Sequence, residues 1–318
     1  MKLVLYRAEL GLELLPGLLT ERGVVDISLI VRPGHDGQQT MVNLIEDFEA
    51  LRPQLEQAAA QGAAAPLDQV SLVAPLPRPG KILNCIGNYW ENRERDPAPL
   101  NMFMKNPDAV IGPDDTIELP TLAALQSFMH EAELAVVIKG PAKAIDPADW
   151  RDYVFGYTCA IDVTARGEGR YTWPNKPVMS WLGKSFDTFA PLGPCIVTAD
   201  EIVNPNDLHV RLWNNEDLRH DYSTSDMEHP VSEILEFITQ VMTLKSGDVI
   251  CCGTNHEGLG YLQDGEVVRI DIQGIGEMTL TVSDPLKRNW ERGVYMGADS
   301  TNHEAVRRHR PDLERTLK

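Results

Sequence analysis

Residues 128–138 read FMHEAELAVVI, and this stretch limits the possible folds more than any other in the chain. Positions 134–138 are apolar without interruption, which predicts a strand buried on both faces. Glu131 and Glu133 are two residues apart, so in a strand their side chains point to the same face. A surface ladder of solvated carboxylates is the alternative, but the apolar run favours burial. Buried anions must be paired or bind a metal.

A third carboxylate, Asp162, lies at the end of a second apolar run, residues 152–162. The Tyr and Phe residues in this run are typical of a strand. Three carboxylates offer hard oxygen ligands, which suit Mg²⁺ or Mn²⁺ better than Zn²⁺, a metal that prefers His and Cys. The two runs together therefore indicate a site for Mg²⁺ or Mn²⁺.

The remaining patterns predict an α+β, mainly β protein with few helices. Residues 42–59 carry apolar side chains at helical spacing, and Pro53 is expected to dent or divide that helix. A second helix follows Pro230. Residues 267–272 and 278–282 flank a glycine-containing turn, which is a strong hairpin signal.

The 318 residues are enough for one large domain or two ordinary ones. The segment QGAAAPLDQV, residues 61–70, is small and weakly patterned, so a boundary is expected near it. We predict a small N-terminal α+β domain at residues 1–78, a catalytic domain at residues 79–285 and a C-terminal tail at residues 286–318. The tail carries a formal charge of +3 against −21 for the rest of the chain. It either docks on an acidic surface, of this chain or of a second subunit, or is a solvated helix end.

Composition and charge limit the classes of binding partner and the cellular compartment that we expect for this protein. The formal net charge of −18 disfavours nucleic acid and anionic membranes as partners. No apolar stretch approaches the roughly eighteen residues of a membrane span, and the charged N-terminal stretch is unlike a signal peptide. Five cysteines without a CxxC pair argue against a disulfide framework. We expect a reduced, cytoplasmic protein.

Several longer motifs resemble the fumarylacetoacetate hydrolase superfamily. They cover roughly residues 80–285 in the family's order, and they are HEAELAVVI, DYVFGYTCAIDVTAR, GKSFDTFAPLGP, VTADEIVNP, TSDM, the SGDVI–GT turn and the GIGEM hairpin. The resemblance implies a mixed β-roll or β-sandwich core and, usually, a homodimer. It also implies a divalent metal held by Glu131, Glu133 and Asp162, and a 2-oxo acid or 1,3-diketone substrate that chelates this metal.

The resemblance also assigns residues around the metal. Lys184 matches the family lysine, whose ammonium pairs with a ligand carboxylate or stabilises the substrate's enolate; a surface lysine is the alternative. Tyr89 and Lys105 lie where the family often contacts substrate, and Thr254 matches the threonine that holds the substrate's carboxylate. Arg166 either contacts substrate or is a structural clamp on a carboxylate, and both readings stay open.

The chain departs from the family in the segment NYWENRER, residues 88–95. The hydrolytic members have Asn-Tyr-x-x-His-x-x-Glu there, and their His and Glu form a base dyad that activates water. In this chain the two positions are Asn92 and Arg95, which cannot act as that dyad. Glu91 and Glu94 lie nearby, but they are out of register with the family glutamate.

A second departure is GTNHEGLG, residues 253–260, where the family commonly has a GTPxGVG-like turn. It places His256 and Glu257 close to Thr254. His256 is a candidate replacement base, oriented by Glu257 or Glu94, because only histidine titrates unperturbed near neutrality. The alternative is a hydrogen bond from His256 to the loop backbone alone. His220 replaces a glutamine that is usual in the family and is expected to face the pocket.

These features predict a divalent-metal-dependent hydrolase that cleaves a C–C bond in an acylpyruvate-like or 1,3-diketo acid through a metal-stabilised enolate. An isomerase, tautomerase, hydratase or decarboxylase acting on a 2-oxo or 2-hydroxydienoic acid is the first alternative. A non-catalytic homologue is the second. Trp90, Trp173 and Trp181 suggest an apolar or aromatic portion of the substrate, as in aromatic compound catabolism, although tryptophans are often simply core residues.

Overall fold

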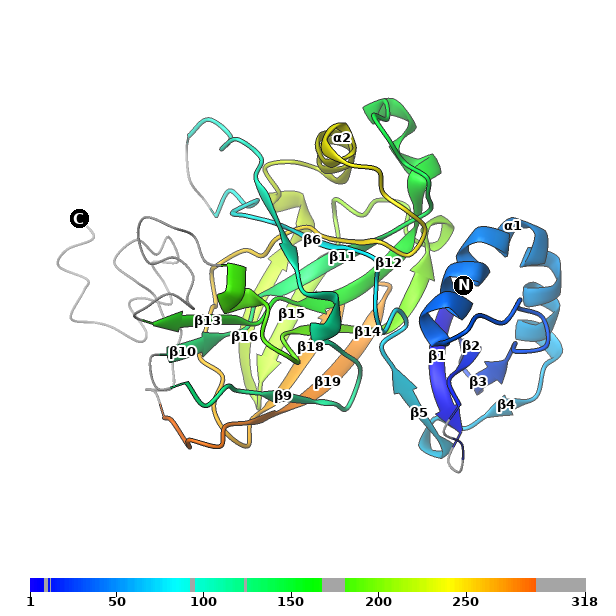
Figure 1. Ribbon diagram of the computed structural model, residues 1–318, viewed down its shortest axis with the longest axis horizontal. Helices are drawn as coiled ribbons and strands as arrows, with labels where there is room; N and C mark the ends of the chain where they lie inside the picture. Colours follow the sequence, from blue (N-terminus) through cyan, green and yellow to red (C-terminus); the bar gives the residue numbers. More distant parts are fainter. Residues whose placement is uncertain (9–10, 12, 92–94, 123–124, 168–180, 290–318) are drawn as a thin grey trace.

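The structure is a computed structural model that describes residues 1–8, 11, 13–91, 95–122, 125–167 and 181–289. Asn92, Glu94 and Trp173, which the sequence had singled out, lie outside the described residues, as does the predicted tail from residue 290 onward. The described part is dominated by strands (Figure 1). The predicted mainly β fold with few helices is therefore confirmed.

The N-terminal segment folds as a small antiparallel sheet packed on one long helix. Its strands are β1 (Lys2–Ala8), β2 (Leu15–Thr20), β3 (Gly23–Asp26), β4 (Ala64–Ala65) and β5 (Val70–Val73). Helix α1 (Gly37–Gln61) begins earlier than predicted because Asp36 caps it, accepting the Gln39 N–H at 2.7 Å. Pro53 lies inside α1 without dividing it.

The main sheet continues from the N-terminal strands into the rest of the chain. In spatial order it runs β4-β3-β2-β1-β14-β12-β11-β17-β6-β7. The strands not yet named are β6 (Ile82–Cys85), β7 (Met102–Lys105), β11 (Ala132–Ile138), β12 (Val154–Ile161), β14 (Ala190–Thr198) and β17 (Val249–Cys251). β5 pairs with β1, and the short β8 (Val110–Ile111) pairs with β14. The segment predicted as a linker thus supplies β4 and the start of β5, while the predicted domain limits stay a prediction.

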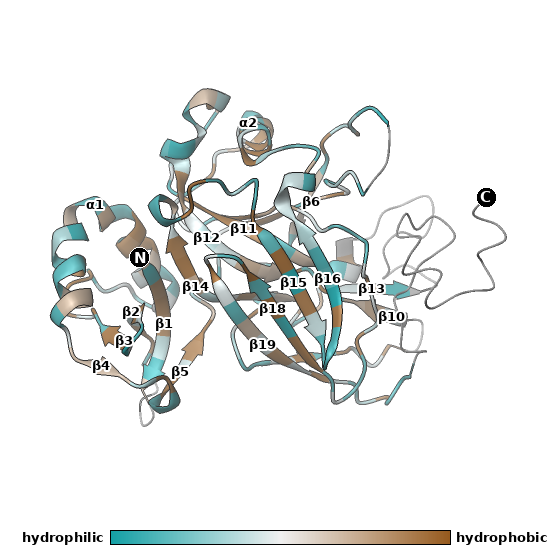
Figure 2. Ribbon diagram, turned by 180° about the vertical axis from the view of Figure 1, so that it is seen from behind, coloured by the Kyte–Doolittle hydropathy of each residue, from teal (hydrophilic) through white to brown (hydrophobic). Residues whose placement is uncertain are grey.

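A second sheet covers one face of the main sheet. Its order is β16 (Asp217–Ser223), β15 (His209–Asn214), β18 (Val267–Ile272), β19 (Gly276–Ser283) and β9 (Thr116–Glu118). Figure 2 shows apolar and polar residues alternating along these strands, as expected when one face is buried. β18 and β19 form the predicted hairpin, and its turn uses Gly274 at φ 82°. Apolar residues of both sheets share one core, and those on the opposite face of the main sheet form a second core with α1.

Helices and short turns complete the fold. Helix α2 (Val231–Val241) follows Pro230 as predicted. The 3₁₀ turns are η1 (Leu67–Gln69), η2 (Pro107–Ala109), η3 (Pro147–Tyr153), η4 (Trp181–Lys184), η5 (Ala199–Glu201) and η6 (Thr224–Asp226). No helix in the described ranges is long and apolar enough to cross a membrane. All five cysteines are buried and free.

The apolar run of the FMHEAELAVVI stretch is central strand β11, and each of its residues is buried. β11 lies between β12 and β17, so it is covered at both edges as well as on both faces. Glu131 differs from expectation because it precedes the strand. The chain leaves β10 (Leu125–Met129), which pairs with β13 (Thr164–Gly167) in a separate two-stranded sheet, and changes partners at this point. Glu131 therefore lies in the two-residue connection between β10 and β11, directly before the first residue of β11.

Candidate metal centre and active site

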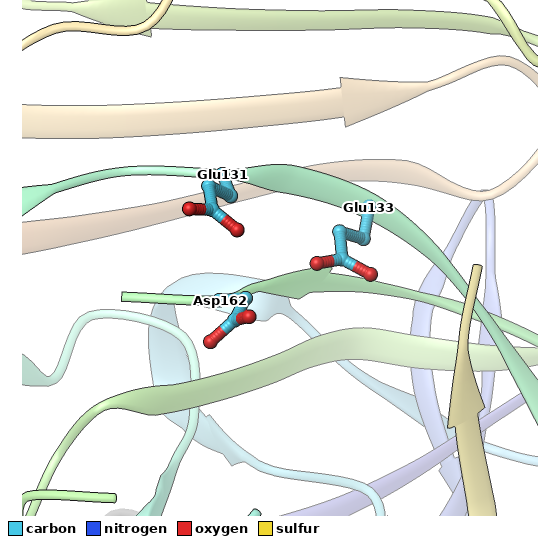
Figure 3. Close-up of side chains that lie close together, drawn as sticks. All are labelled: Glu131, Glu133 and Asp162. Carbon is cyan, nitrogen blue, oxygen red and sulfur yellow. The ribbon is translucent and has the colours of Figure 1, made fainter. Parts of the chain in front are cut away.

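Three buried carboxylates meet where β11 begins and β12 ends. Ala132 pairs with Ile161, so the residues just outside this pair, Glu131 and Asp162, are neighbours, and the Asp162 N–H donates to the Glu131 carbonyl at 2.8 Å. Glu133 is on β11. One carboxylate oxygen from each of Glu131, Glu133 and Asp162 lies within 4.8 Å of the others, and the three side chains converge (Figure 3).

Two buried lysines reach the same carboxylates. Lys184, at the end of η4, places its Nζ 2.7 Å from Glu131 Oε2 and 2.6 Å from Asp162 Oδ2. Lys105, on β7, contacts the other oxygen of Asp162. Lys184 is 3% exposed, so the alternative of a surface lysine is wrong. Both lysines therefore contact the acidic cluster, while the predicted role of Lys105 in substrate binding stays a prediction.

The charges of the cluster are unevenly compensated. Burial opposes ionisation of Glu131, but the charges of Lys184, His256 and Arg166 outweigh it and lower the pKa of Glu131. Burial, together with the charges of Asp162 and Glu131, holds the pKa of Glu133 well above its usual range. Of the three carboxyls, Glu133 is therefore the one whose ionised form is most disfavoured when no cation is bound.

This donor set fits a divalent cation. Three carboxylates face two ammonium groups, and the excess negative charge falls on Glu133, whose Oε2 also accepts the Gly253 N–H at 2.7 Å. A cation bound by carboxylates takes the place of a bound proton. Oxygen ligands alone suit Mg²⁺ or Mn²⁺. The residues that would hold it are Glu131, Glu133 and Asp162.

Three further residues that the resemblance assigns to substrate binding are Tyr89, Thr254 and Arg166. Tyr89 is buried, with its ring edge-to-face against Tyr222 at 5.1 Å, and Thr254 is 3% exposed. Arg166, on β13, lies close enough for its charge to lower the pKa of Glu131. Its Nε has no hydrogen-bond partner among the described residues, so both readings of Arg166 stay open. Trp181 is the first residue of η4, three residues before Lys184.

His256 is paired with Glu91. The carboxylate of Glu91 contacts His256 Nδ1 and accepts the His256 backbone N–H at 2.8 Å. The alternative that His256 bonds only to loop backbone is therefore wrong. The carboxylate at its ring is Glu91 rather than Glu257, and Glu94 lies outside the described residues. Sequence spacing missed Glu91 because the pair joins two loops 165 residues apart.

His220 lies in the core beside a second histidine. It is fully buried, and its Nε2 lies 3.2 Å from His130 Nδ1. The ring thus packs against His130 within the core, while its Nδ1 makes no hydrogen bond to a described residue. Its predicted role in substrate binding stays a prediction.

Comparison with known families identifies the chain. Residues 85–283, more than half of it, match the fumarylacetoacetate (FAA) hydrolase C-terminal family. The chain belongs to the fumarylacetoacetate hydrolase family. The match spans β6 to β19 and so contains all three cluster carboxylates and both lysines.

Relatives in the fumarylacetoacetate hydrolase family carry several activities. The mitochondrial oxaloacetate tautomerase Fahd2a of Rattus norvegicus is 34% identical over 252 residues, covering 75% of this chain and 78% of the relative. Maleylpyruvate hydrolase from Sphingobium sp. SYK-6, solved with manganese(II) and pyruvate, is 34% identical, with 89% of this chain and 99% of that chain covered and a TM-score of 0.78. The 5-carboxymethyl-2-hydroxymuconate delta-isomerase of Mycobacterium smegmatis is 30% identical, with 89% and 99% covered and a TM-score of 0.69.

Arg95, which stands in place of the glutamate of the fumarylacetoacetate hydrolase dyad, has another contact. Its guanidinium forms an ion pair with Glu228, whose side chain is fully buried and also accepts the Ala98 N–H at 2.6 Å. Arg95 therefore anchors its loop and supplies no base.

Asn84 is a polar residue near the cluster that sequence reasoning missed. It is buried on β6, opposite Cys251 and Phe103, and both of its side-chain polar atoms have no partner among the described residues. Phe103 lies under Lys184, with Nζ 5.3 Å from the ring centre. The available signal was an amide inside the apolar run KILNCIG.

Proposed function

We propose that the protein is a divalent-metal-dependent hydrolase that cleaves a C–C bond in an acylpyruvate-like or 1,3-diketo acid. The observation that carries the proposal is the buried cluster of Glu131, Glu133 and Asp162 with Lys184 bridging two of its carboxylates. A hydrolase relative that binds manganese and pyruvate supports the same substrate class.

The residues of the cluster and its neighbours stabilise and orient the enolate of the substrate. A divalent cation, when bound at the three carboxylates, supplies Lewis-acid stabilisation of negative charge on a 2-oxo acid. The Lys184 ammonium adds a fixed positive charge, which favours an enolate over the neutral ketone. Lys105 holds Asp162 in place. Thr254 and Tyr89 orient the substrate's carboxylate and carbonyl groups.

His256 acts as the general base on water. Its Nε2 takes a proton from water, and the oxygen forms a bond to the acyl carbonyl carbon. The C–C bond then breaks, and its electron pair stays on the 2-oxo acid fragment as an enolate. Protonated His256 returns the proton to carbon, so the products are a carboxylic acid and a 2-oxo acid such as pyruvate. Glu257, the next residue, stays a predicted contributor to this step.

Tautomerase or isomerase activity is the second candidate, because a relative at 34% identity is an oxaloacetate tautomerase. Enolate stabilisation serves this reaction without an activated water. The two are separated by assaying the full chain, loaded with Mn²⁺ or Mg²⁺, on acetylpyruvate and on the enol form of oxaloacetate. Loss of diketo absorbance with pyruvate release supports the hydrolase. Ketonisation of oxaloacetate alone supports the tautomerase, and the absence of any metal-dependent turnover supports a non-catalytic homologue.

A further inference from the structure

We propose that Glu91 is the positioning carboxylate of His256, so that the water-activating dyad is assembled from two different loops, and that Asp226 joins these loops. The inference deepens the proposed hydrolase function and rests on it. The family's usual dyad comes from one loop; here the loop after β6 supplies the carboxylate and the loop after β17 supplies the imidazole.

The contact between Glu91 and His256 has the geometry that a dyad needs. A carboxylate only accepts hydrogen bonds, so the contact at Nδ1 places the ring proton there and leaves the Nε2 lone pair basic. The same Glu91 oxygen also accepts the His256 backbone N–H at 2.8 Å. This second bond holds the His256 backbone, and with it the position of the ring, against Glu91. Nε2 makes no hydrogen bond to a described residue.

The positioning carboxylate is buried, whereas the imidazole that must reach water is partly exposed. The Glu91 side chain is 4% exposed, whereas the His256 side chain is 40% exposed. A buried carboxylate is shielded from water and holds its partner firmly. The imidazole keeps a face toward solvent, from which the substrate water comes. The loop that carries His256 also reaches the acidic cluster, because the Gly253 N–H donates to Glu133 Oε2 at 2.7 Å.

Glu91 is held in a backbone conformation that local preference disfavours. Its φ is 53°, in the left-handed region that a non-glycine residue rarely adopts. Asp226 stabilises this turn from both sides, because its carbonyl accepts the Trp90 N–H at 3.0 Å and its Oδ2 accepts the Glu91 N–H at 3.1 Å. This backbone turn orients the Glu91 carboxylate toward His256, and the two bonds to Asp226 offset the cost of the positive φ.

The same Asp226 oxygen reaches the other loop. Its Oδ2 accepts the Asn255 Nδ2 at 2.9 Å, and Asn255 Oδ1 accepts the Glu257 N–H at 2.8 Å. One carboxylate thus connects the residue before His256 to the backbone of Glu91. This arrangement makes Asp226 a positioning residue that acts through both members of the dyad.

The His256 loop is supported on its far side by Arg219 of β16. Gly258 has φ 100°, and a Cβ there would lie 1.8 Å from the Arg219 carbonyl oxygen. A Cβ on Gly260 would lie 1.9 Å from Arg219 Nη2. Only glycine fits at position 258, whereas a Cβ at position 260 would require the Arg219 guanidinium to move, so the GTNHEGLG segment has a defined turn next to His256.

The test compares Glu91→Gln with Glu233→Gln in the full-length protein. Glu233 is the matched control because it also contacts a histidine Nδ1, that of His229 at 2.9 Å, but lies exposed on α2. In the Mn²⁺-loaded proteins we expect Glu91→Gln to lower kcat for acetylpyruvate cleavage by about 10²-fold. KM and the deuterium exchange at C3 of pyruvate should change by less than about tenfold, since exchange depends on the metal and Lys184. Equal loss of cleavage and exchange, or no loss, overturns the dyad.

A second readout needs neither metal nor turnover. In metal-free protein labelled with ¹⁵N-histidine, His256 should be the Nδ1–H tautomer, and Glu91→Gln or Asp226→Asn should shift its ring signals while Glu233→Gln leaves them in place. An Nε2–H tautomer in the wild type overturns the inference even if a variant fails to fold. If the wild type does not cleave acetylpyruvate but shows the Nδ1–H tautomer, the hydrolase proposal fails while the Glu91–His256 pair stands.

Discussion

Lys184 Nζ lies 2.6 Å from Asp162 Oδ2, so a buried ammonium contacts a carboxylate that also belongs to the candidate metal site. Despite burial, the charges of Asp162 and Glu131 raise the pKa of Lys184. Lys184 therefore stays charged and compensates two carboxylates of the candidate metal site. With a divalent cation bound at that site, negative charge on a substrate would meet two positive centres.

Glu131→Ala, Glu133→Ala and Asp162→Ala should each abolish Mn²⁺ or Mg²⁺ binding and activity, while the protein stays folded. Titration calorimetry measures the binding, and Glu118→Ala, an exposed glutamate on β9, is the control. Wild-type protein should gain about 2.7 kcal/mol of unfolding free energy at a metal concentration 100 times Kd, and EDTA should reverse this gain. Full activity in excess EDTA would contradict the metal assignment.

Lys184→Met should lower both acetylpyruvate cleavage and C3 exchange, each by at least about 10²-fold, because the lysine stabilises the enolate common to both reactions. His256→Gln should instead remove mainly cleavage, by about 10²- to 10⁴-fold. Parallel assays of the two variants check this difference. If His256→Gln and His220→Gln both leave turnover unchanged, no histidine base operates, and the tautomerase reading is favoured.

Arg95→Met should destabilise the protein by about 3 kcal/mol, the lower end for a buried pair, because it leaves the buried Glu228 carboxylate without its partly exposed cation. Arg95→Glu should be worse and should not restore the family dyad, since it brings a second carboxylate against Glu228. Urea unfolding measures both. Arg78→Met, which breaks an exposed pair with Asp108, is the control and should have no measurable effect. Equal stability of the Arg95 and Arg78 variants would show that the buried pair contributes nothing.

Acid should destabilise the fold through His220. Burial lowers the pKa of His220 to about 4 from an ordinary 6.5; the charges of Arg219 and His256 add to this, and the His130 carbonyl and Glu131 oppose it. Because the folded-state pKa lies below the unfolded one, the neutral ring's stabilisation is present above pH 6.5 and is lost as the pH falls toward 4. Between pH 7 and pH 5 this removes about 2 kcal/mol of unfolding free energy.

Urea unfolding at pH 7 and pH 5 checks this loss. His220→Gln should show a smaller fall than the wild type, while His209→Gln, at an exposed histidine, should show the same fall. An undiminished fall in His220→Gln would assign the acid sensitivity to other groups, of which buried His130 is the first candidate because its pKa is also lowered by burial.

We expect at least a homodimer. β7 is the last strand in the order of the main sheet, and its Met104 is 50% exposed, which leaves an apolar side chain on an edge that no described strand covers. The sequence from residue 286 carries a net charge of opposite sign to the acidic remainder. Sedimentation at micromolar concentration should give twice the mass of the 35.4 kDa chain, and a monomer there would refute this expectation.

Sequence patterns predicted the features that depend on local order. The apolar run became β11, the glycine turn gave the β18–β19 hairpin, and Pro230 preceded α2. Motif resemblance placed Lys184 beside the carboxylates, which the structure brings together. The Glu91–His256 pair could not be predicted, because a positive φ and an Asp226 bond turn Glu91 out of the register that the motif assumes.

Strand β14 is hydrogen-bonded to β12 on one edge and to β1 on the other, where Leu3 pairs with Ile196. Phe48 of α1 also packs edge-to-face on Phe155 of β12, with ring centres 5.1 Å apart. A truncated chain that starts at residue 85, where the family match begins, would lose both β1 and α1. The edge of β14 that pairs with β1 would then be exposed, and an exposed strand edge is a template for aggregation. For expression or fusion, the smallest unit that keeps β14 paired on both sides begins at β1.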